Sequence, residues 1–167
     1  MQNNELEMGE YDLIVSMTDT KGYITYCNDT FVKMAEYEYS EIVGQPHNMI
    51  RHPDMPKAVF KLLWDRVQSK KPLFAFVKNR SKLGNYYWVK AFVYPVVENG
   101  QLKNIVSYRK RITPFVKQEI IKIYDDLLRY ETSHSVDESL KYLLGKLESK
   151  GLTYDQMIDK LSLEQSI

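Results

Sequence analysis

The chain has 167 residues, of which 44% are hydrophobic and 13% aromatic, so it can bury the core of one domain with an appendage. Its formal net charge of +1 argues against nucleic acid as the main partner. Cys27 is the single cysteine, which excludes an intrachain disulfide. With a polar, acidic start (MQNNELEMGE) and no apolar run long enough to cross a bilayer, we expect a cytoplasmic protein whose membrane contact comes through a partner.

The first elements along the chain are a predicted β-hairpin and two short helices. Residues 12–17 (DLIVSM) and 23–27 (YITYC) are rich in strand formers and flank a turn. Asn28 is suited to cap the helix that follows. The stretch SEIVG then predicts one more helical turn, capped by Ser40 and ended by Gly44.

The densest polar stretch of the sequence is QPHNMIRHPDMP, residues 45–56. It contains three prolines, two histidines, an arginine and an aspartate, so we expect no regular helix or strand there. Asp54 is the predicted N-cap of a long helix that runs to about Ser69. The apolar residues of this helix cover a wider arc than the stripe of a surface helix, which indicates more than one packing partner.

Three strands are predicted next, over residues 73–80, 86–97 and 102–112, with a hairpin turn at Glu98-Asn-Gly-Gln. Both faces of the middle strand are largely apolar, so we expect both faces of the sheet to be covered.

The sequence changes character at Pro114. Apolar residues then follow a heptad-like spacing, which predicts an amphipathic helix; they are Val116, Ile120, Ile123, Leu127 and Tyr130. A second helix should start at Ser135 or Asp137, and a third, weaker one should follow residue 151. This tail could cover the sheet, form a homodimer or dock on a partner.

The order of these elements resembles a PAS domain, an α+β fold in which helices cover one face of a five-stranded antiparallel sheet. Three motifs, YCNDTF, GQPHNMIRHPDMP and VKNRSKLGNYYWV, resemble the PAS sensors of bacterial aerotaxis and energy-taxis receptors, and above all the stand-alone PAS partner of a split receptor. The resemblance divides the chain into an N-terminal extension (1–11), a PAS sensor domain (12–113) and a C-terminal helical interaction region (114–167).

The resemblance implies a function as well as a fold. It implies a redox sensor that binds FAD without covalent attachment and signals in trans to a membrane-bound chemotaxis transducer, through the helical tail or the outer sheet face. Because the chain has neither a dinucleotide-binding glycine fingerprint nor a P-loop, we expect no enzymatic activity. We expect no metal site either, because two histidines five residues apart do not supply the ligands that zinc requires.

The resemblance also implies which residues hold the cofactor. They are Asn28, Arg51, His52, Asp54, Phe60, Trp64, Asn79 and Arg80. Asn28 and Asn79 carry amides that suit the polar edge of a flavin ring. A nearby cation would stabilise negative charge on that ring. In one respect the chain departs from the family, because Leu73 stands where a family member has tryptophan.

Two alternatives remain open at the level of sequence. The chain could be a cofactor-free PAS adaptor or dimerisation module whose own side chains fill the interior. It could also be a haem-binding gas sensor, because one histidine suffices as an axial ligand, and His47 and His52 are the candidates.

Overall fold

The structure is a computed structural model, and it describes residues 2–164. Its strands are β1 (Ile14–Thr18), β2 (Ile24–Cys27), β3 (Leu73–Arg80), β4 (Tyr86–Glu98) and β5 (Gln101–Arg111). Its helices are α1 (Asp29–Ala35), α2 (Tyr39–Ile42), the 3-10 turn η1 (His47–Ile50), α3 (Lys57–Gln68), α4 (Pro114–Glu131), α5 (Val136–Glu148) and α6 (Tyr154–Leu163).

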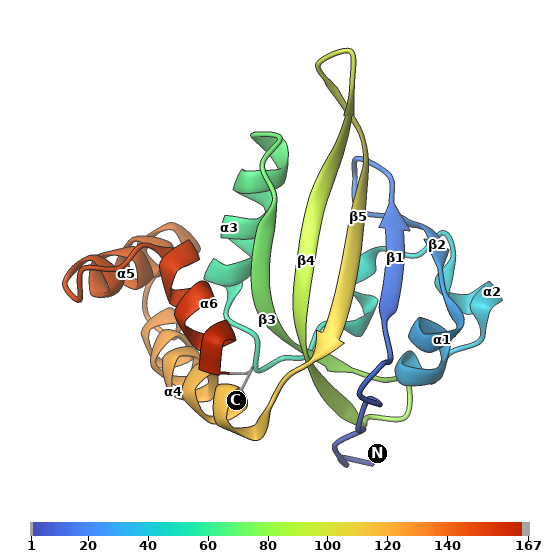
Figure 1. The fold of residues 1–167 in the computed structure, drawn as a ribbon, viewed down its shortest axis with the longest axis horizontal. Coiled ribbons are helices and arrows are strands. Elements are labelled where there is room, and N and C mark those ends of the chain that lie inside the picture. The colour runs from blue at the N-terminus through green and yellow to red at the C-terminus, as the bar shows by residue number, and fades with distance from the viewer. Residues whose placement is uncertain (1, 165–167) are drawn as a thin grey trace. The chain divides into compact units, whose positions relative to one another are not determined.

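The five strands form one antiparallel sheet in the order β2-β1-β5-β4-β3 (Figure 1). This confirms the predicted fold class, including the β1–β2 hairpin. The β4–β5 turn consists of Asn99 and Gly100, which both have positive φ, as a two-residue hairpin turn of this hand requires. Beyond Val93, β4 pairs with β5 alone, so the tip of this hairpin is a two-stranded ribbon.

Local signals in the sequence place some element ends correctly and others within a few residues. Asn28 caps α1, as predicted, by accepting a hydrogen bond from the amide of Phe31. The predicted cap of α2 at Ser40 is wrong, because the N-cap lies two residues earlier and the helix begins at Tyr39. Glu38 is its N-cap, and the Glu41 carboxylate accepts from the Glu38 amide at 2.9 Å.

The proline-rich stretch is more regular than expected. Residues His47–Ile50 form one turn of 3-10 helix, which the extended backbone of Pro46 (φ −65°, ψ 138°) precedes. The expectation of no helix in this stretch is therefore wrong, since a single turn fits between prolines that block longer elements. The helix α3 begins at Lys57, three residues after its predicted cap at Asp54.

The chain divides into two compact units. The first contains the residues up to His52 and Arg66–Arg111, and the second contains Pro53–Asp65 and the residues from Ile112 onward. The chain passes between the units at three places, one of which falls within α3. In the first unit, Cys27 at the end of β2 pairs with Ser16 and is 3% exposed; burial, and next the charge of Asp29, raise the pKa of its thiol.

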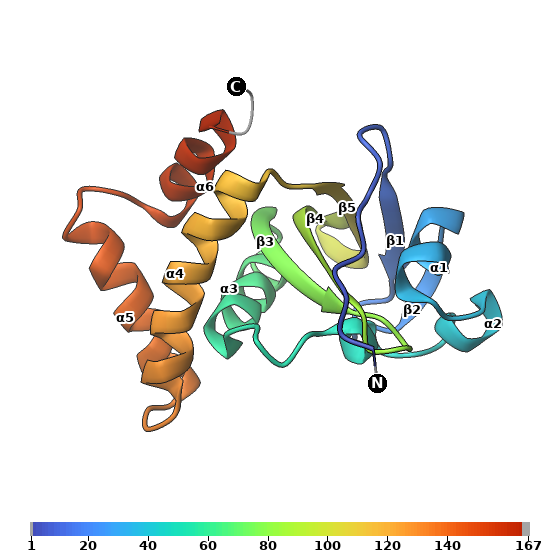
Figure 2. The ribbon, with the colours of Figure 1, turned by 90° about the horizontal axis from the view of Figure 1, so that it is seen from below.

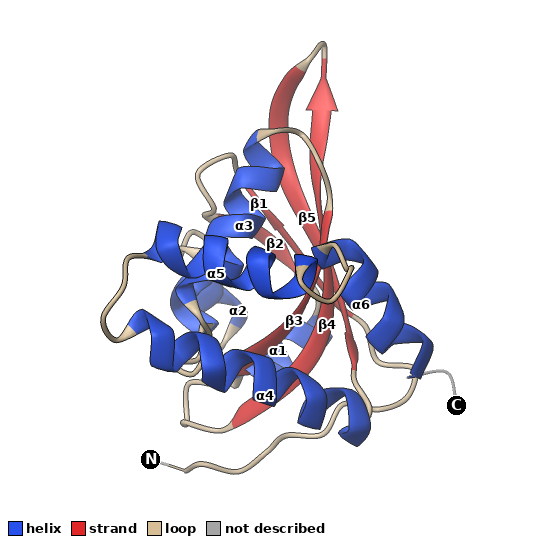
Figure 3. Cartoon of the chain, turned by 90° about the vertical axis from the view of Figure 1, so that its left-hand side faces the viewer, coloured by secondary structure: helices blue, strands red, loops and turns tan. Residues whose placement is uncertain are grey.

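In the second unit, α5 packs against α4, and α6 packs against α5 (Figure 2 and Figure 3). The buried residues of the three helices are mostly apolar. The predicted stripe of α4 is confirmed at Val116, Ile120 and Leu127, but Tyr124 rather than Ile123 is buried between them. A straight α-helix advances by 3.6 residues per turn, so the buried stripe drifts from a strict heptad. Among residues 2–164, no helix is long and apolar enough to cross a membrane.

Candidate functional site

Five buried polar residues share one face of the sheet in the first unit. They are Ser16 of β1, Asn79 of β3, Tyr87 of β4, and Ser107 and Arg109 of β5, and none is more than 6% exposed. Ser16 lies opposite Ser107, and Asn79 lies opposite Tyr87. Arg109 lies opposite Ala91 of β4. Ala91 is four residues from Tyr87, and residues separated by an even number of positions along a strand lie on the same face. We call these five residues and His47 the polar cluster.

Arg109 is the charged member of the polar cluster. Its Nη2 donates to Ser16 Oγ at 3.1 Å and to His47 Nε2 at 2.5 Å. Its guanidinium carbon lies 5.6 Å from the centre of the Phe31 ring of α1. Burial lowers the pKa of Arg109 to about 10. No carboxylate within residues 2–164 forms an ion pair with it, so its positive charge is not compensated by the described chain.

His47 is held against Arg109 by the η1 turn. A ring nitrogen that accepts from a guanidinium must be unprotonated, so His47 is neutral and carries its proton on Nδ1. Burial, and next the charge of Arg109, hold the pKa of His47 well below its usual value. Its ring meets Phe31 edge to face at 5.8 Å. Because Nε2 is already engaged, His47 would have to leave Arg109 and Ser16 (3.0 Å) to bind haem iron through that nitrogen.

Four buried polar atoms of the cluster have no hydrogen-bond partner among the described residues. They are Asn79 Nδ2, Tyr87 Oη, Ser107 Oγ and Arg109 Nη1. Each such atom costs about 1–3 kcal/mol when it is left unpaired, so four on one face indicate a missing partner. Burial raises the pKa of Tyr87 to about 12, while the charge of Arg109 and the neighbouring Asn79 amide act in the opposite direction, so its hydroxyl remains a donor at neutral pH.

The donors of the polar cluster suit a flavin ring. Amide, hydroxyl and guanidinium groups would pair with the carbonyl oxygens and ring nitrogens at the polar edge of that ring. The uncompensated cation would favour a ligand that carries or acquires negative charge. A haem would instead require an available histidine nitrogen.

The structure places two predicted binding residues, Asn79 and Arg51, beside each other. Asn79 belongs to the polar cluster, and Arg51 forms an isolated antiparallel bridge with it. The amide of His52 donates to the Lys78 carbonyl at 3.4 Å, and the buried His52 ring lies edge-on to Tyr86 at 6.1 Å. The backbone of residues 51 and 52 therefore runs beside the end of β3.

Asn28 holds the local fold together through its amide. Its Oδ1 accepts from the amides of Val15 (3.0 Å) and Phe31 (3.1 Å), and its Nδ2 donates to the carbonyl of Leu13 (2.8 Å). These three bonds tie the start of β1 to α1. A contact between Asn28 and a cofactor stays a prediction.

The remaining predicted residues, Arg80, Asp54, Phe60 and Trp64, are not members of the polar cluster. Arg80 is exposed at the end of β3. Asp54, Phe60 and Trp64 belong to the second unit, and Trp64 is 36% exposed. Their roles as cofactor ligands stay predictions.

Sequence reasoning missed four members of the polar cluster as site residues: Ser16, Tyr87, Ser107 and Arg109. One signal could have revealed Arg109. It stands in the alternating series Ile105, Ser107, Arg109, where a charge at an inward position of a buried strand is unexpected and indicates a ligand.

Comparisons with known proteins agree with this architecture. The PAS fold family model matches residues 24–109. The chain is 41% identical over 144 residues to the aerotaxis receptor of Escherichia coli, which covers 84% of this chain and 28% of that protein. It is 27% identical over 103 residues to the biofilm dispersion protein BdlA of Pseudomonas aeruginosa, covering 60% and 25%. The chain thus spans about a quarter of the length of these relatives.

Solved structures show the same fold. A PAS domain from Colwellia psychrerythraea matches with a TM-score of 0.55 at 22% identity, over 62% of this chain and 90% of that one. The light-state structure of the blue-light photoreceptor Aureochrome1 LOV matches with a TM-score of 0.57 at 18% identity, over 70% and 91%. The family model covers more than half of the sequence and all but the first strand of the sheet, and on this evidence the chain belongs to the PAS fold family.

Proposed function

We propose that this PAS domain is a redox sensor that binds FAD non-covalently at the polar cluster. The observation that carries the proposal is the buried, uncompensated charge of Arg109. Beside it lie Asn79, Tyr87 and Ser107, whose buried side-chain atoms make no well-aligned hydrogen bond among the described residues, although the Asn79 amide is near enough to the Tyr87 hydroxyl to act on its pKa. A protein that buries such a set without a ligand loses stability. A ligand with acceptors and developing negative charge would supply the missing partners.

A bound flavin would supply reversible electron transfer, and the chain's residues would tune and detect it. Arg109 would stabilise negative charge and so raise the reduction potential. Asn79, Tyr87 and Ser107 would orient the ring by hydrogen bonds. His47 would hold the guanidinium in place while remaining neutral, so that it adds no second positive charge.

The proposed output is binding and signalling rather than catalysis. The similarity to the E. coli aerotaxis receptor supports a role in taxis signalling. We propose that the partner is a membrane-bound chemotaxis transducer, reached in trans from the cytoplasm. The sheet face opposite the polar cluster offers one docking surface. On it Phe74, Phe92, Tyr94 and Tyr108 form a row with ring centres 4.4, 5.4 and 5.9 Å apart, and Phe74 is 40% and Tyr108 37% exposed.

The test is the visible absorption spectrum of the freshly purified full chain, before and after dithionite. Flavin bands that bleach on reduction support the proposal, and chromatography of the heat-released cofactor separates FAD from FMN. A Soret band would indicate haem instead. A featureless spectrum that stays unchanged after incubation with FAD would contradict the proposal and favour the cofactor-free adaptor.

Three variants connect the spectrum to the polar cluster. Arg109→Gln should lose at least about tenfold in flavin affinity, since it removes the buried charge. Arg109→Lys should keep part of the affinity and of the potential. Lys103→Gln makes the same change of charge at an exposed position of β5 and should behave as the unsubstituted chain does.

A further inference from the structure

The last residue of α4 holds the first turn of α3 within the second unit. Both carboxylate oxygens of Glu131 accept from this turn, Oε2 from the amide of Lys57 and Oε1 from the amide of Ala58, each at 2.9 Å. The residue before α3 is Pro56, whose side chain has no acceptor. A carboxylate more than seventy residues away in sequence therefore takes the capping role that Asp54 was predicted to have.

Further contacts tie the start of α5 to the same place. The buried Ser139 donates through Oγ to Glu131 Oε1 at 2.9 Å. Lys61 of α3 forms an ion pair with Asp137 of α5 at 3.5 Å. Glu131 thus stands where α3, α4 and α5 meet, and its two oxygens accept three hydrogen bonds. We call this arrangement the Glu131 latch.

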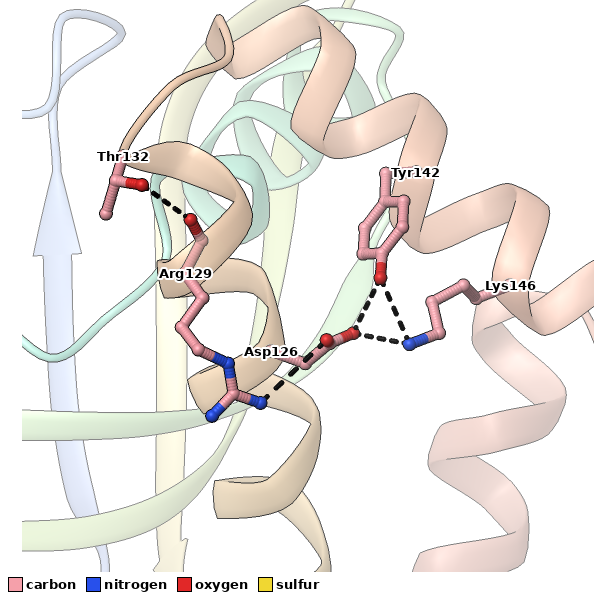
Figure 4. A network of polar contacts seen from close by, with 5 residues as sticks. All are labelled: Asp126, Arg129, Thr132, Tyr142 and Lys146. Carbon is pink, nitrogen blue, oxygen red and sulfur yellow. Dashed lines mark hydrogen bonds and ion pairs between the residues drawn. The ribbon is translucent and has the colours of Figure 1, made fainter.

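The helices α4 and α5 are joined to each other by hydrogen bonds and by ring stacking close to Glu131. Figure 4 shows Asp126 of α4 accepting from Tyr142 (3.1 Å) and Lys146 (2.5 Å), both on α5. The Tyr130 and Tyr142 rings stack with centres 4.1 Å apart. Because α4 and α5 are joined at several points, movement at Glu131 should affect the pair as a body rather than one side chain.

The Glu131 latch holds residues that directly follow the proline-rich stretch in the sequence. Lys57 follows directly on residues 51–56, the stretch whose backbone bridges Asn79 of the polar cluster through Arg51. We infer that Glu131 is a positioning residue that couples order in residues 53–58 to order in α4 and α5, and so carries the state of the sensor to its helical region. Its use as a relay rests on the proposed function, whereas the coupling itself does not.

Amide hydrogen exchange of the full chain, followed residue by residue by NMR, tests the coupling. Glu131→Ala should accelerate exchange several-fold to about tenfold at the amides of Lys57 and Ala58, and in parallel at residues 132–139. Ser139→Ala should do so more weakly, because it leaves both amide bonds in place. Glu148→Gln, an exposed change of the same charge at the end of α5, should leave exchange unchanged.

The variant Glu131→Gln separates charge from shape, since it keeps one oxygen acceptor and should fall between the unsubstituted chain and Glu131→Ala. Faster exchange at residues 57 and 58 with residues 132–139 as protected as before would overturn the coupling. So would unchanged exchange at both places.

The same samples, oxidised and dithionite-reduced, test the relay. In the unsubstituted chain, reduction should change exchange near Arg109 and in α5. In Glu131→Ala the change near Arg109 should persist and the change in α5 should vanish; if both persist, the relay is overturned. A chain without flavin bands would overturn the proposed function and with it the relay. The coupling between residues 53–58 and the α4–α5 pair would then be decided by the exchange data alone.

Discussion

Replacing Arg109 by methionine should stabilise the flavin-free chain while it removes the cofactor. The pKa of Arg109 falls from 12.5 to about 10 through burial, which corresponds to a penalty of about 3 kcal/mol on the charged form. Methionine has similar length and no charge, so the penalty disappears. The variant also loses the hydrogen bonds to Ser16 and His47, each worth about 1.5 kcal/mol because the donor is charged, but these two residues keep their mutual contact at 3.0 Å.

The net gain should be at most about 1 kcal/mol in the free energy of unfolding, measured by urea denaturation at pH 7 on protein stripped of flavin. For a chain of this size that is a rise of a few degrees in Tm. Lys103→Met, at an exposed position, should change neither quantity, and Arg109→Lys should show no gain. If Arg109→Met lowers the free energy of unfolding by 1 kcal/mol or more, the guanidinium is compensated in the free protein, and the reasoning that leads from it to a ligand fails.

Three further predictions concern stability. The pKa of His47 is lowered in the folded state, so the contribution of His47 to the free energy of unfolding is present above its unfolded pKa of about 6.5 and is lost as pH falls, by up to about 1.4 kcal/mol per pH unit. The stability advantage of the unsubstituted chain over His47→Gln should therefore shrink between pH 7 and pH 5 in urea titrations. The exposed His134→Gln is the control. Asn28→Ala should lower the free energy of unfolding by about 2–4 kcal/mol, since three hydrogen bonds are lost, and Asn28→Asp by about half as much, because it keeps the acceptor; equal losses would contradict this account. Asp126→Asn should lower it by no more than about 1 kcal/mol, because its partner Lys146 is 48% exposed, and a larger loss in thermal melts would show that the α4–α5 network is stronger than a surface ion pair.

Local patterns in the sequence predicted the elements of this fold well. Strand β3 begins and ends at the predicted residues, and α4 begins at Pro114, where the sequence changes character; its cap, Thr113, was not among the predicted caps. These ends depend on nearest neighbours: a proline with no amide hydrogen, or a hydroxyl three residues before an unpaired amide. The cap of α3 was not predictable in this way. Its acceptor is Glu131, and only the folded chain brings that carboxylate to Lys57.

The candidate site was predictable where one short motif holds its residues and not where several strands contribute. Asn79 and Arg51 were found through motifs, and the structure places them side by side. Arg109 and Ser16 are 93 residues apart and meet only because β5 pairs with β1 in a particular register. A shift of β1 by one residue against β5 would turn Ser16 to the other face and away from Arg109, so this contact depends on pairing that no local pattern encodes.

The buried Cys27 has a practical consequence for spectroscopy. A thiol reacts with maleimides as the thiolate, and a side chain that is 3% exposed with a raised pKa offers little of it. A cysteine introduced at the solvent-facing tip of the β4–β5 hairpin would therefore take up a fluorophore or spin label selectively, without first replacing the native residue. A second label on α5 would give a distance that can be followed as the redox state of the sample changes.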